Sequence, residues 1–155
     1  MDATTMPSTP SLLTRLKGNY PQFQFTSADD FLWSPSEQTI YYGELPTGDS
    51  FLLHELSHGI LNHSGYKRDI ELIAMERAAW DQASLLAPQY DRVLDLELIE
   101  DTLDTYRDWL HARSSCPKCD ATGLQTKKDT YHCPACNHDW RVNEARVCVL
   151  RRFNT

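Results

Sequence analysis

Residues 52–61 read Leu52-Leu53-His54-Glu55-Leu56-Ser57-His58-Gly59-Ile60-Leu61. This stretch contains the pattern His-Glu-x-x-His, set among apolar residues that can form one face of a helix. Because residues four apart lie one above the other on a helix, His54 and His58 can direct imidazole nitrogens at one metal ion. Glu55 lies a quarter turn round from His54 and can reach a water molecule without binding the metal itself. The spacing therefore predicts a helical zinc site with Glu55 as general base.

The residues around the motif predict the limits and the burial of this helix. Asp49 or Ser50 supplies an N-cap, and Gly65 supplies a C-terminal stop. The apolar face predicts a largely buried helix, in which His and Glu side chains are costly without partners. A core helix that merely carries two satisfied histidines is therefore the less favoured interpretation.

Length and composition restrict the class of protein. The chain has 155 residues, of which 41% are hydrophobic, enough for one domain of ordinary size and a small appendage. No apolar run approaches the length of a membrane span, and residues 1–10 lack the basic and apolar regions of a signal peptide. We therefore expect a flexible tail at residues 1–10, no membrane partner and a cytoplasmic location.

The cysteines predict a second zinc site. Four of the five form two Cys-Pro-x-Cys pairs, Cys116 with Cys119 and Cys133 with Cys136. Two such pairs place four thiolates around Zn²⁺ in a closed structural site, with a β-hairpin turning near residues 127–129. We therefore expect two zinc ions per chain, one catalytic and one structural. The fifth cysteine, Cys148, is predicted to be a small buried hydrophobic residue.

The charge of the chain changes where the cysteines begin. Residues 1–115 hold 8 Lys/Arg against 18 Asp/Glu, a net charge of −10. Residues 116–155 hold 7 against 4, a net charge of +3. This change predicts a main domain over residues 11–113 and a zinc-ribbon domain over residues 114–155.

Local patterns predict three strands and three further helices in the main domain. The strands are expected at residues 23–25, 31–33 and 39–42, the last two forming a hairpin. The helices are expected at residues 11–17, 69–86 and about 92–112. We therefore predict an α+β fold, with a β-hairpin or small sheet and three main helices, followed by a β zinc ribbon.

The third ligand of the catalytic zinc must come from outside the motif, because such sites usually use three protein ligands. The candidates are His63, Glu71 and Glu76. His63 lies about 140° round the helix from His58 and cannot join the pair unless the helix breaks. A second helix that begins near Asp69 and runs back antiparallel needs about six residues to reach the level of His58, which favours Glu76 over Glu71. The glutamate that does not bind metal could orient a ligating histidine through its free ring nitrogen.

A hairpin, a His-Glu-x-x-His helix and a Glu-bearing helix together resemble the gluzincin metallopeptidases. The run Glu76-x-x-Ala79-x-x-x-Ala83 is similar to the second helix of the ImmA/IrrE-type metallopeptidases, and the similarity covers about residues 20–88. The run Glu71-x-x-Ala74-x-x-x-Ala78 fits the same pattern in another phase, so the ligand stays open. Trp80 departs from the family, which usually has a small polar residue there. SprT-type proteases also carry a zinc ribbon, but they use a third histidine that this chain lacks between residues 63 and 111.

The resemblance implies a zincin-like domain with the activity of a zinc metalloendopeptidase. His54, His58 and Glu76 would hold the catalytic zinc, and a zinc-bound water with Glu55 as base would hydrolyse peptide bonds of an intracellular protein. The resemblance also implies that strand 39–42 presents an edge to an extended peptide. Three residues could stabilise the oxyanion, and nothing in the sequence selects among them: Tyr41, Tyr42 and Tyr66.

The ribbon could bind nucleic acid, since it interleaves basic and aromatic residues. These are Lys118, Lys127, Lys128, Arg141, Arg146, Arg151 and Arg152, with Tyr131, Trp140 and Phe153. The net charge of +3 is modest, which favours a role in stability or protein docking. The alternative to an enzyme is a catalytically inactive metallopeptidase-like binding protein, whose ribbon docks protein or nucleic acid.

Overall fold

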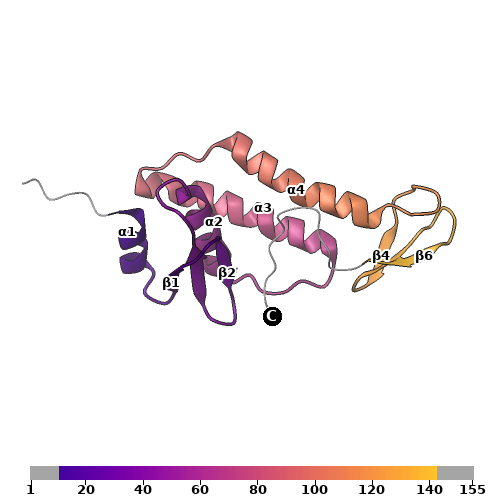
Figure 1. Ribbon diagram of the computed structural model, residues 1–155, viewed down its shortest axis with the longest axis horizontal. Coiled ribbons are helices and arrows are strands. Elements are labelled where there is room, and N and C mark those ends of the chain that lie inside the picture. Colours follow the sequence, from indigo (N-terminus) through magenta and orange to yellow (C-terminus); the bar gives the residue numbers. More distant parts are fainter. Residues whose placement is uncertain (1–10, 143–155) are drawn as a thin grey trace, which may run out of the picture.

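The computed structural model describes residues 11–142 (Figure 1). Its helices are α1 (Leu12–Asn19), α2 (Asp49–Ile60), α3 (Asp69–Leu86), the short 3-10 helix η1 (Ala87–Tyr90) and α4 (Leu96–Ser114). Its strands are β1 (Gln24–Ser27), β2 (Leu32–Ser34), β3 (Thr39–Tyr42), β4 (Leu124–Lys127), β5 (Thr130–His132) and β6 (Asp139–Arg141). The predicted α+β class is therefore confirmed. The predicted tail and Cys148 lie outside the described residues.

The first three strands form one sheet in the order β1-β3-β2. The predicted hairpin is present, with β2 antiparallel to β3. The prediction that strand 39–42 offers an edge is wrong, because β1 pairs with the other side of β3 in parallel, with Gln24 opposite Thr39. The outer strands of this sheet are β1 and β2.

Helix α2 packs tightly against the sheet. Leu52, Leu53 and Leu56 are fully buried, as the apolar face predicted. At Gly59 an added Cβ would lie 3.1 Å from the Trp33 ring and 3.2 Å from the Phe23 ring. The absence of a side chain at Gly59 thus lets the sheet approach α2 directly beside the second histidine of the motif.

Helix α2 ends at Ile60, earlier than the predicted stop at Gly65. Asn62 takes a left-handed conformation with φ of 56°. The Asn62 N–H donates to the Gly59 carbonyl at 3.0 Å, and the His63 N–H donates to the His58 carbonyl at 2.9 Å. This pair of bonds is a Schellman motif, and it turns the chain back over the last turn of the helix.

Helices α3 and α4 run alongside each other, and the ribbon strands follow the end of α4 (Figure 1). Helix α3 begins at Asp69 as predicted, but Asp69 is its first residue rather than its cap. Helix α4 begins at Leu96, later than predicted, because the Asp95 carboxylate caps it by accepting from the Glu97 N–H at 2.9 Å. Arg92 lies before the helix and instead pairs with Asp49 at 2.9 Å.

Strands β4, β5 and β6 form an antiparallel sheet that contacts the helices through buried polar groups. The Asp69 carboxylate accepts from Arg113 Nε at 2.9 Å and from the Tyr131 hydroxyl at 2.7 Å. Arg113 also reaches Asp129 at 3.0 Å, and its carbonyl accepts from Trp140 Nε1 at 3.0 Å. The ribbon is thus attached to the first turn of α3 and the last turn of α4. Across residues 11–142, none of the helices has both the length and the apolar character that crossing a membrane requires.

Candidate metal centre

The structure brings His54, His58 and Glu76 together in the interior. His54 Nε2 lies 2.8 Å from Glu76 Oε2, His58 Nε2 lies 3.2 Å from Glu76 Oε1, and the two Nε2 atoms are 3.1 Å apart. All three side chains are at least 95% buried. These residues form a group whose ligand atoms could hold a metal ion.

The dimensions of this group fit a zinc ion. Ligand atoms about 2.1 Å from a tetrahedral zinc lie roughly 3.4 Å from one another, close to the separations of the nitrogen and oxygen atoms here. Two imidazoles and a carboxylate are also a donor set of catalytic zinc sites, which leave one position for water or substrate. The group is therefore suited to zinc in both geometry and chemistry.

Glu76 reaches the histidines because α3 returns antiparallel to α2 from its start at Asp69. Burial raises the pKa of Glu76, but the charges of His58 and His54 and their hydrogen bonds outweigh burial, so the pKa is lowered overall. Glu71, the other candidate, is an exposed residue in the first turn of α3 and accepts from the Lys67 N–H at 3.0 Å. The structure thus places Glu76, and not Glu71, beside the motif.

His63 lies beside the outer ring nitrogen of His58, a position that the sequence predicted for the glutamate that does not bind metal. The Schellman turn brings His63 Nδ1 to 2.9 Å from His58 Nδ1, so one ring donates a hydrogen bond to the other. Burial, and then the neighbouring His58, lowers the pKa of His63 to about 4. A neutral His63 can therefore orient His58 while His58 Nε2 faces the metal position.

His54 is held by its contact with Glu76 and by stacking on Trp80. Its ring lies over the indole of Trp80, with centroids 4.1 Å apart and planes 24° apart. Among the described residues, His54 Nδ1 has no hydrogen-bond partner and is buried. Trp80, the departure from the ImmA/IrrE pattern, thus supports His54 with its ring face where a polar residue would supply a hydrogen bond.

Glu55 lies beside the group without joining it. It is 3% exposed, and its Oε2 accepts from the Trp33 backbone N–H on β2 at 3.0 Å. The motif therefore separates into two metal-facing histidines and one carboxylate held between helix and sheet. This is the arrangement in which a carboxylate can serve as base rather than ligand.

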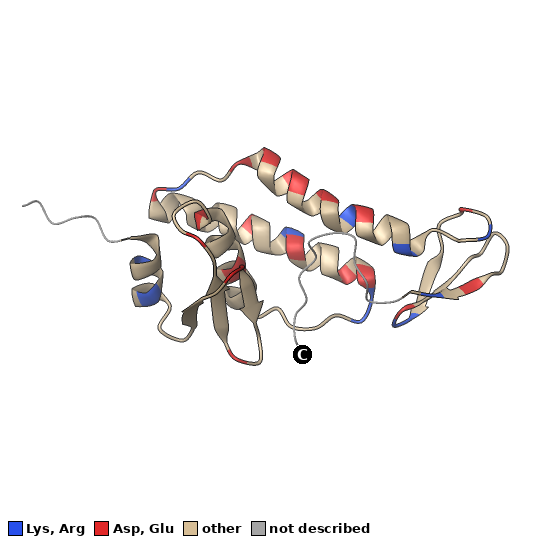
Figure 2. Ribbon diagram, in the orientation of Figure 1, with Lys and Arg blue, Asp and Glu red and all other residues tan. Residues whose placement is uncertain are grey.

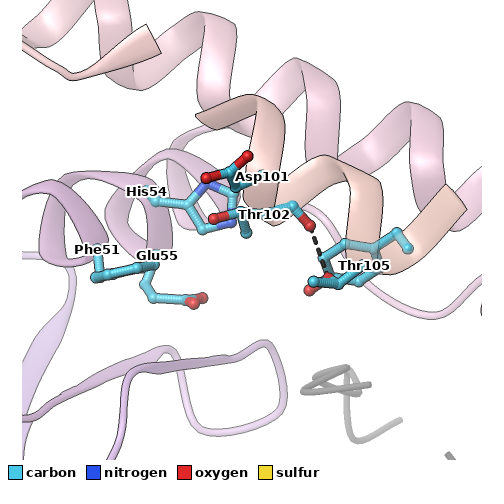
Figure 3. Close-up of a pocket in the computed structure, with 7 residues that line it drawn as sticks. Phe51, His54, Glu55, Asp101, Thr102 and Thr105 are labelled. Atoms are coloured by element: carbon cyan, nitrogen blue, oxygen red, sulfur yellow. Dashed lines mark hydrogen bonds between the residues drawn. The ribbon is translucent and has the colours of Figure 1, made fainter. Parts of the chain in front are cut away.

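A cavity of about 340 Å³ opens beside His54 and Glu55 (Figure 3). Its wall on α2 consists of Phe51, His54 and Glu55, and its wall on α4 consists of Asp101, Thr102, Thr105 and Tyr106. Tyr106 belongs to a buried apolar cluster, but no sequence signal indicated that the polar residues near it on α4 would face the motif.

None of the three tyrosines proposed for the oxyanion lines this cavity. The Tyr41 hydroxyl donates to Glu37, on another part of the surface. Tyr42 packs against the main core, and Tyr66 packs against the cluster of Leu72, Tyr106 and Trp109.

The four cysteines form a second group that could hold a metal ion. Cys116 Sγ lies 3.6 Å from Cys136 Sγ, and Cys119 Sγ lies 3.5 Å from Cys133 Sγ. Sulfur ligands about 2.3 Å from a tetrahedral zinc lie roughly 3.8 Å apart, so this group also fits zinc. His132 does not join it, since its Nδ1 pairs with Asp139 at 2.6 Å.

Comparison of the chain with protein-family models, curated proteins and solved structures gives no match in any of the three. The resemblance to gluzincins therefore depends on residues 54–58 and on the position of Glu76 beside the two histidines.

We predict two zinc ions per chain, and that the two groups bind them separately. His58→Ala should lose one zinc because it removes a nitrogen from the buried group, while Cys119→Ser should lose the other. Elemental analysis of metal-replete protein measures both. Loss of both metals in either variant, or one zinc per chain in the wild type, would contradict two independent sites.

Glu76→Gln is expected to weaken zinc binding at the histidine group by more than about 100-fold. Removal of a residue that only hydrogen-bonds to a metal ligand typically weakens binding by roughly 10–100-fold, so a larger effect indicates a ligand. The amide keeps the shape but removes the charge that faces both histidines. Glu71→Gln is the matched control and should change the affinity by less than about twofold, because Glu71 is exposed. Competition titration with a chromogenic zinc chelator measures both, and equal effects would show that Glu76 is not a ligand.

Proposed function

We propose that this chain is a zinc-dependent metalloendopeptidase of the gluzincin type that hydrolyses peptide bonds in a protein substrate. The observation that carries the proposal is the group of His54, His58 and Glu76, with Glu55 beside it and a cavity open to both Glu55 and His54. A purely structural zinc site has no use for a buried carboxylate next to the ligands or for access from solvent.

Metal binding and proton transfer belong to different residues in this proposal. His54, His58 and Glu76 would hold zinc, which supplies Lewis-acid activation of a carbonyl group and of water. Glu55 removes a proton from water as the water oxygen bonds to the carbonyl carbon, and it returns that proton to the leaving nitrogen as the carbon–nitrogen bond breaks. The Trp33 N–H holds the Glu55 carboxylate in place from β2.

The position of β2 supports binding of an extended peptide. It is an outer strand of the sheet and contacts α2, which carries the motif. A peptide that adds to an outer strand gains main-chain hydrogen bonds with little regard to its sequence. We therefore assign the peptide-binding edge to β2 in place of β3.

The contacts of the ribbon favour a stabilising role over nucleic-acid binding. Tyr131, one of the aromatic residues that could have contacted nucleic acid, is 2% exposed, and its hydroxyl donates to Asp69. Trp140 makes stacked contacts with Tyr131 and with His138, with ring centroids 5.7 and 6.2 Å away. Arg146, Arg151, Arg152 and Phe153 lie outside the described residues.

Hydrolysis of unfolded proteins and peptide libraries by zinc-replete protein tests the proposal, with mass spectrometry to identify new termini. Activity should disappear with a chelator and return with zinc. Zinc-loaded wild type that cleaves nothing in such a panel would favour the inactive binding protein instead.

A further inference from the structure

The cavity beside the motif has two chemically different walls, and the α4 wall plays no part in the proposed chemistry. Its α2 wall carries His54 and Glu55, so any group that enters lies next to the reacting centre (Figure 3). Its α4 wall carries Asp101, Thr102 and Thr105. A volume of about 340 Å³ lies in the range of roughly 300–1,000 Å³ that small-ligand sites occupy.

Packing holds the two aromatic residues of the cavity in place, Phe51 on the α2 wall and Tyr106 on the α4 wall. Phe51 lies between Phe31 and Trp80, with ring centroids at 5.7 and 5.9 Å. Tyr106 is 3% exposed and belongs to the apolar cluster between α3 and α4. The cavity therefore offers a fixed aromatic surface along which an aliphatic chain can lie.

The α4 wall carries a negative charge that has no ion-pair partner among the described residues. Figure 2 shows acidic residues spaced along α4. Arg107 pairs with Glu100 at 2.9 Å and with Asp104 at 2.8 Å, which neutralises part of this charge. Within residues 11–142, Asp101 forms no ion pair, and it is the member of this acidic series that lines the cavity.

We propose that this cavity is a specificity pocket for a lysine or arginine side chain next to the bond to be cleaved. This inference rests on the proposed metallopeptidase function and deepens it. The aliphatic stem of such a side chain lies against Phe51 and Tyr106, and its cationic end reaches the Asp101 carboxylate at the exposed rim. The net charge of −10 over residues 1–115 adds a long-range attraction for basic peptides.

Three probes test the pocket without requiring turnover: the N-acetyl hydroxamates of arginine, norleucine and glutamate. They share a zinc-chelating group and differ in the side chain placed beside the metal. Binding to zinc-loaded full-length protein is measured by calorimetry at low and high salt. The arginine probe should bind about fivefold more tightly than norleucine at low salt, as expected for a partly exposed ion pair, and glutamate should bind least.

Asp101→Asn should remove the preference for arginine over norleucine, and Asp101→Lys should turn it into a preference for glutamate. Asp108→Asn is the matched control: it removes the same charge from an exposed position about 10 Å further along α4, outside the cavity. The control should keep the arginine preference.

The amide NMR signals of Thr102 and Thr105 locate the probe, and both should shift when the arginine probe binds. Equal affinities for arginine and norleucine in the wild type, equal effects of Asp101→Asn and Asp108→Asn, or unmoved threonine signals would each overturn the pocket assignment while leaving the zinc site intact. Failure of all three probes to bind would instead overturn the proposed function together with the pocket.

Discussion

Glu55→Gln is expected to lower the rate of peptide-bond hydrolysis by about 10²–10⁴-fold, the usual contribution of a positioned acid or base. The amide oxygen of glutamine can still accept from the Trp33 N–H, so the hydrogen bond between α2 and β2 is kept. What disappears is the group that takes the proton from water. The variant should therefore retain both zinc ions, and its affinity for peptide should be close to that of the wild type.

The measurement compares initial rates of wild type and Glu55→Gln at equal zinc content on the substrate found with the library. Glu71→Gln serves as the control, since it makes the same chemical change at an exposed position of α3 and should retain full activity. Undiminished cleavage by Glu55→Gln would defeat the mechanism. Loss of zinc from this variant would mean that Glu55 is a ligand, contrary to its position beside Trp33.

The three residues of the histidine group could be predicted from the sequence because their positions follow from helix geometry. The four-residue spacing of His54 and His58 places both rings on one face, and counting six or seven residues onward from Asp69 along the returning helix reaches Glu76 at their level. Both steps use only the rise and turn of regular helices. The four cysteines were equally accessible, since their pairs are local in sequence.

The parts that the sequence did not reveal depend on non-local pairing or on helix ends. The parallel pairing of β1 with β3 has no local turn signal, and it makes β3 an inner strand. Helix α2 ends before Gly65 because Asn62 adopts a left-handed conformation. The same turn determines where His63 lies. The Thr102 and Thr105 wall of the cavity depends on how α3, which packs against both helices, positions α4 relative to α2, and no periodicity in α4 alone can specify this.

Asp69→Asn is expected to lower the free energy of unfolding by about 3–5 kcal/mol, because it removes one partner from a buried ion pair. Asp69 is 3% exposed and Arg113 is 8% exposed, and the Asp69 carboxylate also accepts from the Tyr131 hydroxyl. Burial and the hydrogen bond to Asp69 raise the pKa of Tyr131, which keeps the hydroxyl protonated as a donor. After the substitution, the buried Arg113 charge faces the partly exposed Asp129 carboxylate at 3.0 Å and the Trp109 ring at 4.6 Å, but no longer the buried Asp69 carboxylate.

Urea unfolding of zinc-replete protein measures this effect, and Asp104→Asn is the matched control. Asp104 pairs with Arg107 at 2.8 Å, but its side chain is 58% exposed, so its loss should cost less than about 1 kcal/mol. Asp69 joins the first turn of α3 to the ribbon, and its backbone N–H also donates to the Gln125 side chain at 2.7 Å. We therefore expect the ribbon and the helices to unfold together in the wild type and in two separate steps in Asp69→Asn. Equal, small effects of the two substitutions would mean that the four-cysteine ribbon is tethered by the chain alone, and that the buried ion pair does not couple it to the helix that carries Glu76.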